Sequence, residues 1–119
     1  MGKRVGFESH PFVARDLMEL PSDDLRLLAL ALMKQLRNGN IQGKPLEKRK
    51  STGDLSDCFK ILFDIREDIP PRFRIVYRKL HRGVEVVAVE VLSVGERFDL
   101  EAYVEAAKRL GRISREETE

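Results

Sequence analysis

The segment RFRIVYRK, residues 72–79, alternates charged and apolar side chains with the two-residue period of a β-strand. Its apolar parity holds Phe73, Ile75 and Tyr77, and its arginine parity holds Arg72, Arg74 and Arg78. Successive side chains of a strand point to opposite faces of a sheet. The segment therefore predicts a strand with one apolar face for burial and one face that carries arginines.

Three other segments also predict strands. CFKILFDI, residues 58–65, alternates Phe59, Ile61 and Phe63 with Cys58, Lys60 and Leu62. The following REDIPP is expected to be a loop, because its prolines lack the N–H donors of a strand ladder. After the strand at 72–79, LHRG at 80–83 predicts a hairpin turn. VEVVAVEVLSV, residues 84–94, is apolar on both parities, which is typical of a central strand covered on both faces. The opening segment KRVGFESH, residues 3–10, predicts a short further strand.

Three segments have the spacing of amphipathic helices. PFVARDLMEL, residues 11–20, precedes Pro21, and Ser22 is a suitable N-cap for a second helix that ends at Asn38-Gly39. The apolar stripe of that second helix contains Leu25, Leu28, Leu32 and Leu36, widened by Leu27, Leu30 and Ala31. A last helix, LEAYVEAAKRL at 100–110, follows the potential cap Asp99 and stops at Gly111.

This order of elements predicts an α+β fold in one domain, residues 1–119, with a frayed tail from about 112 to 119. A helical hairpin is expected on one face of a small, twisted, mainly antiparallel four-stranded sheet, followed by a C-terminal helix. The face with Phe59, Ile61, Phe63, Phe73, Ile75 and Tyr77 would bury against the hairpin. The face with Lys60, Arg72, Arg74 and Arg78 would stay uncovered by helices, and residues 41–57 are expected to form a loop.

Charge is unevenly distributed along the chain, although 22 Lys and Arg nearly balance 20 Asp and Glu. Residues 70–84 contain five Lys or Arg and no acid, so a partner would meet a local basic patch. One interpretation is a surface that binds phosphates. The alternative is a solvated face whose arginines pair with Glu85, Glu90 or the acidic tail.

Few other residues offer chemistry. The single cysteine, Cys58, excludes an intrachain disulfide, favours a reducing cytoplasm and is expected to be buried and inert. No segment has the pattern of a signal peptide or a membrane span. The two histidines are far apart, no metal-ligand cluster is evident, and His81 is expected in the turn at the surface. Asp64 and Glu67 are a weak candidate cation site in a loop.

Three motifs together resemble the RelE/ParE toxin superfamily, and within it the RelE branch. They are DCFKI at 57–61, RFRIVYR at 72–78 and VLSVGERFDLEAYVEAAKRL at 91–110, and the resemblance runs from the opening strand to about Leu110. It implies two N-terminal helices against one face of a twisted antiparallel sheet. It also implies a toxin of a type II toxin–antitoxin system, monomeric when free and neutralised by a cognate antitoxin. RelE-type members are endoribonucleases that cut mRNA in the ribosomal A site without metal or cofactor.

The resemblance assigns roles to four residues. Lys60 matches a lysine with a base or charge-stabilising role, and Arg74 matches an arginine that grips the scissile phosphate. Arg97 matches a general acid or phosphate clamp, and Tyr103 matches a tyrosine that stacks on or orients the nucleotide. The 2′-hydroxyl would attack its own phosphate while arginines stabilise the developing charge. Lys60 acts as a base only if neighbouring cations such as Arg74 and Arg78 lower its pKa.

Further basic residues are candidate contacts to RNA or the ribosome. They are Lys44, Lys48, Arg49 and Lys50 in the loop, with Arg72 and Arg78 on the strand; the loop residues fit a merely solvated loop equally well. RelE-type members often carry a second lysine where this chain has Leu62, and a lysine where it has Glu96. Two alternatives stay open: a ParE-like inhibitor of DNA gyrase, and a catalytically weakened module that only binds an antitoxin.

Overall fold

The computed structural model describes residues 5–46, 57–96 and 101–112. Its elements in chain order are β1 (Gly6–Ser9), α1 (Val13–Glu19), α2 (Asp23–Arg37), β2 (Lys44–Pro45), β3 (Cys58–Phe63), β4 (Phe73–Arg82), β5 (Glu85–Glu96) and α3 (Glu101–Arg109). Arg97, Asp99, the loop cations Lys48, Arg49 and Lys50, and the tail beyond 112 lie outside the described residues. None of the described helices is both long and apolar enough to cross a membrane.

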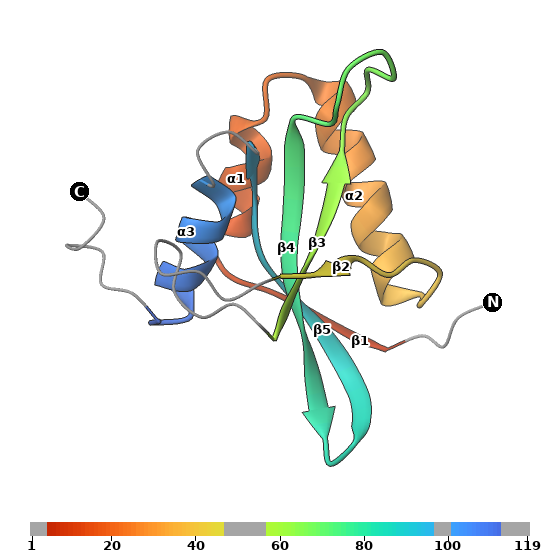
Figure 1. The fold of residues 1–119 in the computed structure, drawn as a ribbon, viewed down its shortest axis with the longest axis vertical. Helices are drawn as coiled ribbons and strands as arrows, with labels where there is room; N and C mark the ends of the chain where they lie inside the picture. The colour runs from red at the N-terminus through yellow and green to blue at the C-terminus, as the bar shows by residue number, and fades with distance from the viewer. Residues whose placement is uncertain (1–4, 47–56, 97–100, 113–119) are drawn as a thin grey trace.

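The strands form one five-stranded sheet in the order β1-β5-β4-β3-β2 (Figure 1). All neighbours are antiparallel except β1, which runs parallel to β5. The α+β class and the mainly antiparallel sheet are confirmed, with five strands instead of four. The additional strand is β2, which lies in the segment predicted as a loop. Two residues are too few to show a period, so the sequence carried no signal for it.

The hairpin between β4 and β5 is longer than predicted. β4 continues through Arg82, so His81 lies on a strand and not in the turn. The turn is at Gly83 and Val84, and Gly83 has the positive φ of 61° that glycine adopts without strain. Figure 1 shows this hairpin extending beyond the rest of the sheet.

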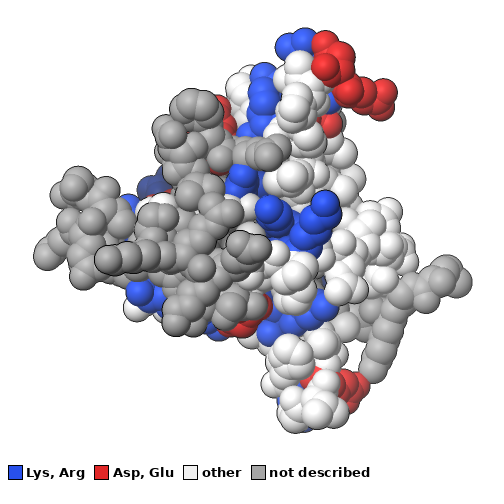
Figure 2. Space-filling model, viewed as in Figure 1, with Lys and Arg blue, Asp and Glu red and all other residues white. Residues whose placement is uncertain are grey.

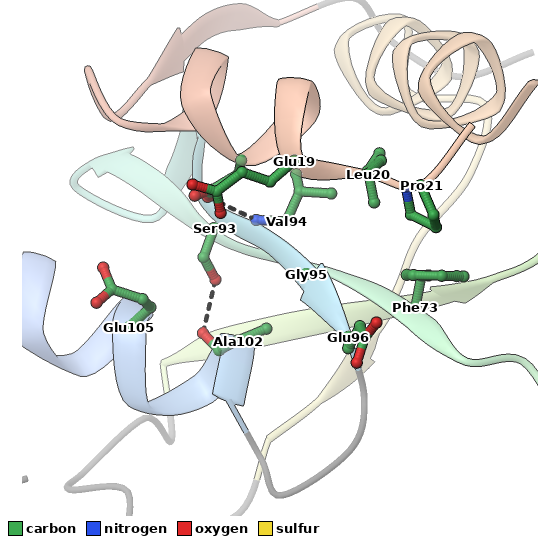
Figure 3. Close-up of a pocket in the computed structure, with 11 residues that line it drawn as sticks. Glu19, Leu20, Pro21, Phe73, Ser93, Val94, Gly95, Glu96, Ala102 and Glu105 are labelled. Atoms are coloured by element: carbon green, nitrogen blue, oxygen red, sulfur yellow. Dashed lines mark hydrogen bonds between the residues drawn. The ribbon is translucent and has the colours of Figure 1, made fainter. Parts of the chain in front are cut away.

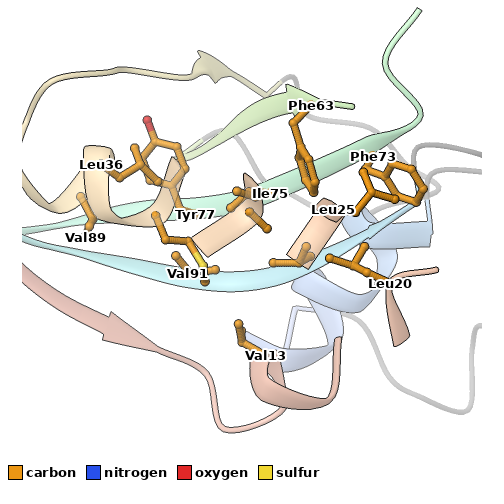
Figure 4. Packing of buried hydrophobic residues seen from close by; sticks show 13 residues of the cluster. Val13, Leu20, Leu25, Leu36, Phe63, Phe73, Ile75, Tyr77, Val89 and Val91 are labelled. Carbon is orange, nitrogen blue, oxygen red and sulfur yellow. The ribbon is translucent and has the colours of Figure 1, made fainter. Parts of the chain in front are cut away.

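The helical hairpin covers one face of the sheet, as predicted. Its core combines apolar side chains of α1 and α2 with the predicted parity of β3 and β4, and β5 completes it (Figure 4). Buried members are Val13, Leu20, Leu25, Ala29, Met33, Leu36, Phe63, Phe73, Ile75, Tyr77, Val89, Val91 and Val94. Ser22 caps α2 by accepting a hydrogen bond from the Leu25 N–H at 3.2 Å. The prediction that Leu27 and Leu30 widen the apolar stripe of α2 was wrong, because both side chains are exposed.

The prediction that no helix covers the arginine face was also wrong. A second core lies there, in which α3 packs its small and aromatic residues on the alternate parity of β3, β4 and β5. Its buried members are Leu46, Cys58, Val76, Leu92, Ala102, Tyr103, Ala106 and Ala107. Cys58 is fully buried, and burial, with the neighbouring Asp57 carboxylate, raises the pKa of its thiol to about 12. The expectation of a buried cysteine is therefore confirmed.

A buried ion pair fixes α3 to the edge of β5. The pairing of β1 with β5 ends at Val91, and beyond it the Asp16 carboxylate accepts a hydrogen bond from the Val94 N–H at 3.0 Å. The Arg109 guanidinium donates to both Asp16 oxygens, at 2.6 and 2.8 Å, and to the Leu92 carbonyl at 2.7 Å. These side chains therefore satisfy backbone groups that β1 leaves without a ladder partner.

Candidate functional site

Basic side chains from three strands project from the face of the sheet that carries α3. Lys60 on β3 is paired with Val76 on β4, so Arg74 and Arg78 are its diagonal neighbours on the same face. Diagonal neighbours are about 7–8 Å apart at Cα, within reach of long side chains. On the other side, Lys44 on β2 is directly opposite Lys60. Figure 2 shows Lys and Arg side chains along the middle of the molecule, over the strands.

Arg74 lies beneath the ring of Tyr103. Its guanidinium carbon is 3.9 Å from the ring centroid, and the two residues are only 3% and 4% exposed. Such cation–π contacts are favourable where both groups are desolvated. The Ser93 hydroxyl donates to the Ala102 carbonyl at 2.7 Å and so fixes the start of α3 on β5. The pairing of a predicted phosphate-binding arginine with a predicted base-stacking tyrosine is thus built into the contact between α3 and the sheet.

Two of the predicted RNA-binding arginines form ion pairs. Arg78 donates to Glu90, its cross-strand partner on β5, at 2.6 Å. Arg72 precedes β4 and donates to both oxygens of Asp64, at 2.7 and 3.0 Å. These hydrogen bonds hold the pKa of the Asp64 carboxyl well below its usual range. Both arginines therefore have local ion-pair partners. For Arg78 this partner is Glu90, one of the acids that the alternative interpretation of the basic patch named.

The described residues offer little to a metal ion. Among them, no three His, Cys, Asp or Glu side chains gather closely enough to hold one. Asp64, the candidate cation ligand of the sequence, binds the Arg72 guanidinium instead. His81 is exposed on the extended hairpin.

A pocket of about 310 Å³ lies between the end of α1, the end of β5 and the start of α3 (Figure 3). Four of its lining residues carry carboxylates: Asp16, Glu19, Glu96 and Glu105. Of these, Asp16 and Glu105 are paired with Arg109. These carboxylates would repel a phosphate, whereas the face that carries Lys60 and Arg74 would attract one.

No family model matches the sequence, and no curated protein matches it either. Solved structures, in contrast, do match this chain. A mutant of the E. coli toxin RelE in the free state has a TM-score of 0.58 and 26% identity, covering 90% of this chain and 98% of that one. The fold is the RelE-like toxin fold.

Two further structures have this fold. The isolated E. coli RelE toxin has a TM-score of 0.50 and 25% identity over 89% of this chain and 98% of that one. The toxin–antitoxin complex RelBE2 from Mycobacterium tuberculosis has a TM-score of 0.56 and 22% identity over 82% and 95%. All three comparisons extend over most of both chains, so the likeness concerns the fold as a whole and not a single motif.

Within this fold, sequence reasoning missed three residues that position the site. Asp16 and Arg109 anchor α3, and Gly43 brings β2 against β3, where a Cβ atom would collide with the Lys60 carbonyl oxygen. An aspartate within the apolar stripe of α1 was a visible signal for a buried ion pair, because it shares a helical face with Val13, Leu17 and Leu20. The closeness of β2 to β3 had no comparable signal.

Proposed function

We propose that this protein is the toxin of a type II toxin–antitoxin system and acts in the cytoplasm as an endoribonuclease on mRNA in the ribosomal A site. The observation that carries the proposal is the position of Lys60 and Arg74 on neighbouring strands of one face, with Tyr103 stacked on Arg74. The RelE-like fold supports it. One neighbour was solved as a toxin–antitoxin complex, and we include a cognate antitoxin as the protein partner.

The chemistry needs a nucleophile, a base and stabilisation of charge. The attacking group is the 2′-hydroxyl beside the scissile phosphate: its oxygen bonds to the phosphorus as the bond from phosphorus to the 5′-oxygen of the next nucleotide breaks. Because this nucleophile belongs to the RNA, correct positioning supplies much of the catalysis. Lys60, whose neighbours on this face of the sheet include Lys44 and Arg74, accepts the proton from this hydroxyl. Arg74 stabilises the negative charge that grows on the phosphate oxygens. Arg97, which lies outside the described residues, takes the role of acid or second clamp by its motif.

Arg74 and Tyr103 are stacked and almost fully buried, so a substrate phosphate reaches the guanidinium only if the ring moves aside. A base can then stack on the tyrosine ring, and the phosphate takes its place over the guanidinium. In the free protein the same contact shields Arg74 from other anions. Binding and release of the ring are therefore part of the reaction cycle.

The test is cleavage of translated mRNA on purified ribosomes, together with growth arrest on induction. Lys60→Ala, Arg74→Ala and Arg97→Ala are each expected to lower the cleavage rate at least about 100-fold, as removal of a charge-stabilising donor does. Lys34→Ala, on the exposed surface of α2, is the matched control with unchanged activity. Circular dichroism checks that each variant is folded.

Lys60→Arg separates the two roles of the lysine. Arginine keeps the positive charge but does not lose its proton, so a base role predicts a loss as large as that of Lys60→Ala. Full activity of the folded Lys60, Arg74 and Arg97 variants would overturn the proposal. DNA damage with filamentation on induction, without mRNA cleavage, would identify a gyrase inhibitor instead.

A further inference from the structure

Lys44 has a position that its sequence context does not explain. The two-residue strand β2 pairs antiparallel with β3 so that Lys44 is directly opposite Lys60. Residues directly opposite each other in a ladder send their side chains to the same face, and like charges in that position destabilise the pair. The stability of the sheet therefore does not explain why two lysines lie directly opposite each other on β2 and β3.

The backbone around Lys44 is tightly fixed. The Gly43 N–H donates to the Tyr77 hydroxyl at 2.8 Å, and the absent Cβ of Gly43 lets the chain contact the Lys60 carbonyl. On the other side, the N–H of the buried Leu46 donates to the Cys58 carbonyl at 3.0 Å. The chain is thus held on both sides of an exposed lysine.

The charge of Lys44 is available to an external anion. No carboxylate of the described residues lies within ion-pair distance of it, whereas Arg72, just before β4, and Arg78, on β4, are paired with acids. Leu62, the residue next to Lys60 on the same face of β3, carries no charge. Lys44 is therefore the cation that adjoins Lys60 on the side away from Arg74.

The distances across the sheet indicate which anion Lys44 meets. Two strand spacings and an offset of two residues place the backbones of Lys44 and Arg74 on the order of 12 Å apart. At that separation the Lys44 ammonium and the Arg74 guanidinium have room to hold two different phosphates of one strand. The line from Arg74 through Lys60 to Lys44 then follows the backbone of the substrate.

We infer that Lys44 is a substrate-binding residue of the active site: its ammonium binds a phosphate of the mRNA that adjoins the scissile one. This inference rests on the proposed function and deepens it. It gives Lys44 a specific role, whereas the sequence grouped it with the loop cations Lys48, Arg49 and Lys50 as a general contact to RNA or the ribosome. The backbone of β2 aims it at the same strand of RNA that Lys60 and Arg74 hold.

The experiment is single-turnover cleavage of synthetic mRNA on programmed ribosomes at saturating toxin. Loss of one charge-assisted contact is expected to slow cleavage by Lys44→Ala at least about tenfold, with Lys44→Arg retaining most of the rate. Binding to ribosomes without mRNA is expected to be unchanged. Lys34→Ala, on the opposite face, controls for a general loss of positive charge.

A neutral methylphosphonate at either adjoining phosphate makes the test specific. At one of the two positions it is expected to slow the wild-type protein about tenfold but to slow Lys44→Ala no further, because the contact is already lost. Additive losses at both positions would overturn the inference. So would a Lys44→Ala variant that cleaves at the wild-type rate, or one whose only defect is weaker binding to ribosomes.

The Lys60→Ala and Arg74→Ala variants in the same assay distinguish the two proposals. If they lose activity and Lys44→Ala does not, the inference fails and the nuclease stands. If they keep full activity, the proposed function itself fails.

Discussion

The ion pair between Asp16 and Arg109 offers the sharpest test of how α3 is held over the sheet. Asp16→Ala removes the acceptor of two hydrogen bonds from Arg109 and of one from the Val94 N–H. The Arg109 side chain is 0% exposed, so its charge would be left buried without that partner. Breaking a buried pair from one side costs about 3–5 kcal/mol. Glu105 and the Leu92 carbonyl still accept from Arg109, which puts the expectation near the lower end.

That loss is large beside the roughly 5–15 kcal/mol that stabilises a typical domain. For a chain of this length it corresponds to a fall in the melting temperature of roughly 10–30 °C. Urea unfolding followed by circular dichroism measures the change in the free energy of unfolding. Glu19→Ala on the same helix is the matched control, since its contact with Arg15 is exposed and is worth less than about 1 kcal/mol.

The double variant Asp16→Ala/Arg109→Met completes the cycle. Because it leaves no buried arginine without its aspartate, and Glu105 stays partly exposed, its loss is expected to be smaller than the sum of the two single losses. An Asp16→Ala variant as stable as the Glu19→Ala control would refute the claim that this pair anchors α3. Strict additivity in the double variant would contradict the buried-charge explanation.

Three further outcomes follow from the described contacts. Gly43→Ala is expected to destabilise the protein by about 1–3 kcal/mol in urea unfolding, because its Cβ would meet the backbone of β3, whereas Gly95→Ala gains only an ordinary contact and should be nearly neutral. Cys58 is expected to resist thiol reagents at pH 8 in the native protein and to react fully in denaturant; rapid native labelling would contradict its burial. Because Arg72 lowers the pKa of Asp64 in the folded state, their pair adds stability above the unfolded carboxyl's pKa of about 4 and loses it as the pH falls further. Asp64→Asn should therefore flatten the stability profile between pH 5 and pH 2, measured by urea midpoints, and an unchanged profile would count against the pair.

Periodicity in the sequence determined the larger part of the fold. Alternation at 58–63 and 73–77 identified the parity of β3 and β4 that buries against the helical hairpin, and the two-sided apolar run identified β5 as central. Ser22 and Gly111 located helix ends correctly, since capping depends on a few neighbouring residues. These are local properties, and each can be derived from a short segment.

The candidate site was only partly accessible in this way. The motif residues Lys60 and Arg74 were placed on one face from parity alone, and the register of β3 with β4 makes them diagonal neighbours. The cover of that face by α3 was not foreseen, because the apolar side of a nine-residue helix does not specify which surface it will meet. For the same reason the stacking of Tyr103 on Arg74 required the structure.

What the sequence by itself determined, then, is which side chains share a face, because a strand or helix repeats its direction every few residues. Only the tertiary structure decided which faces meet and in which register: Lys44 beside Lys60, Asp16 with Arg109, and α3 over the arginines. Those contacts join residues distant in the chain. They depend on close approaches such as that of Gly43, and a one-residue shift in register would undo them without changing any local pattern.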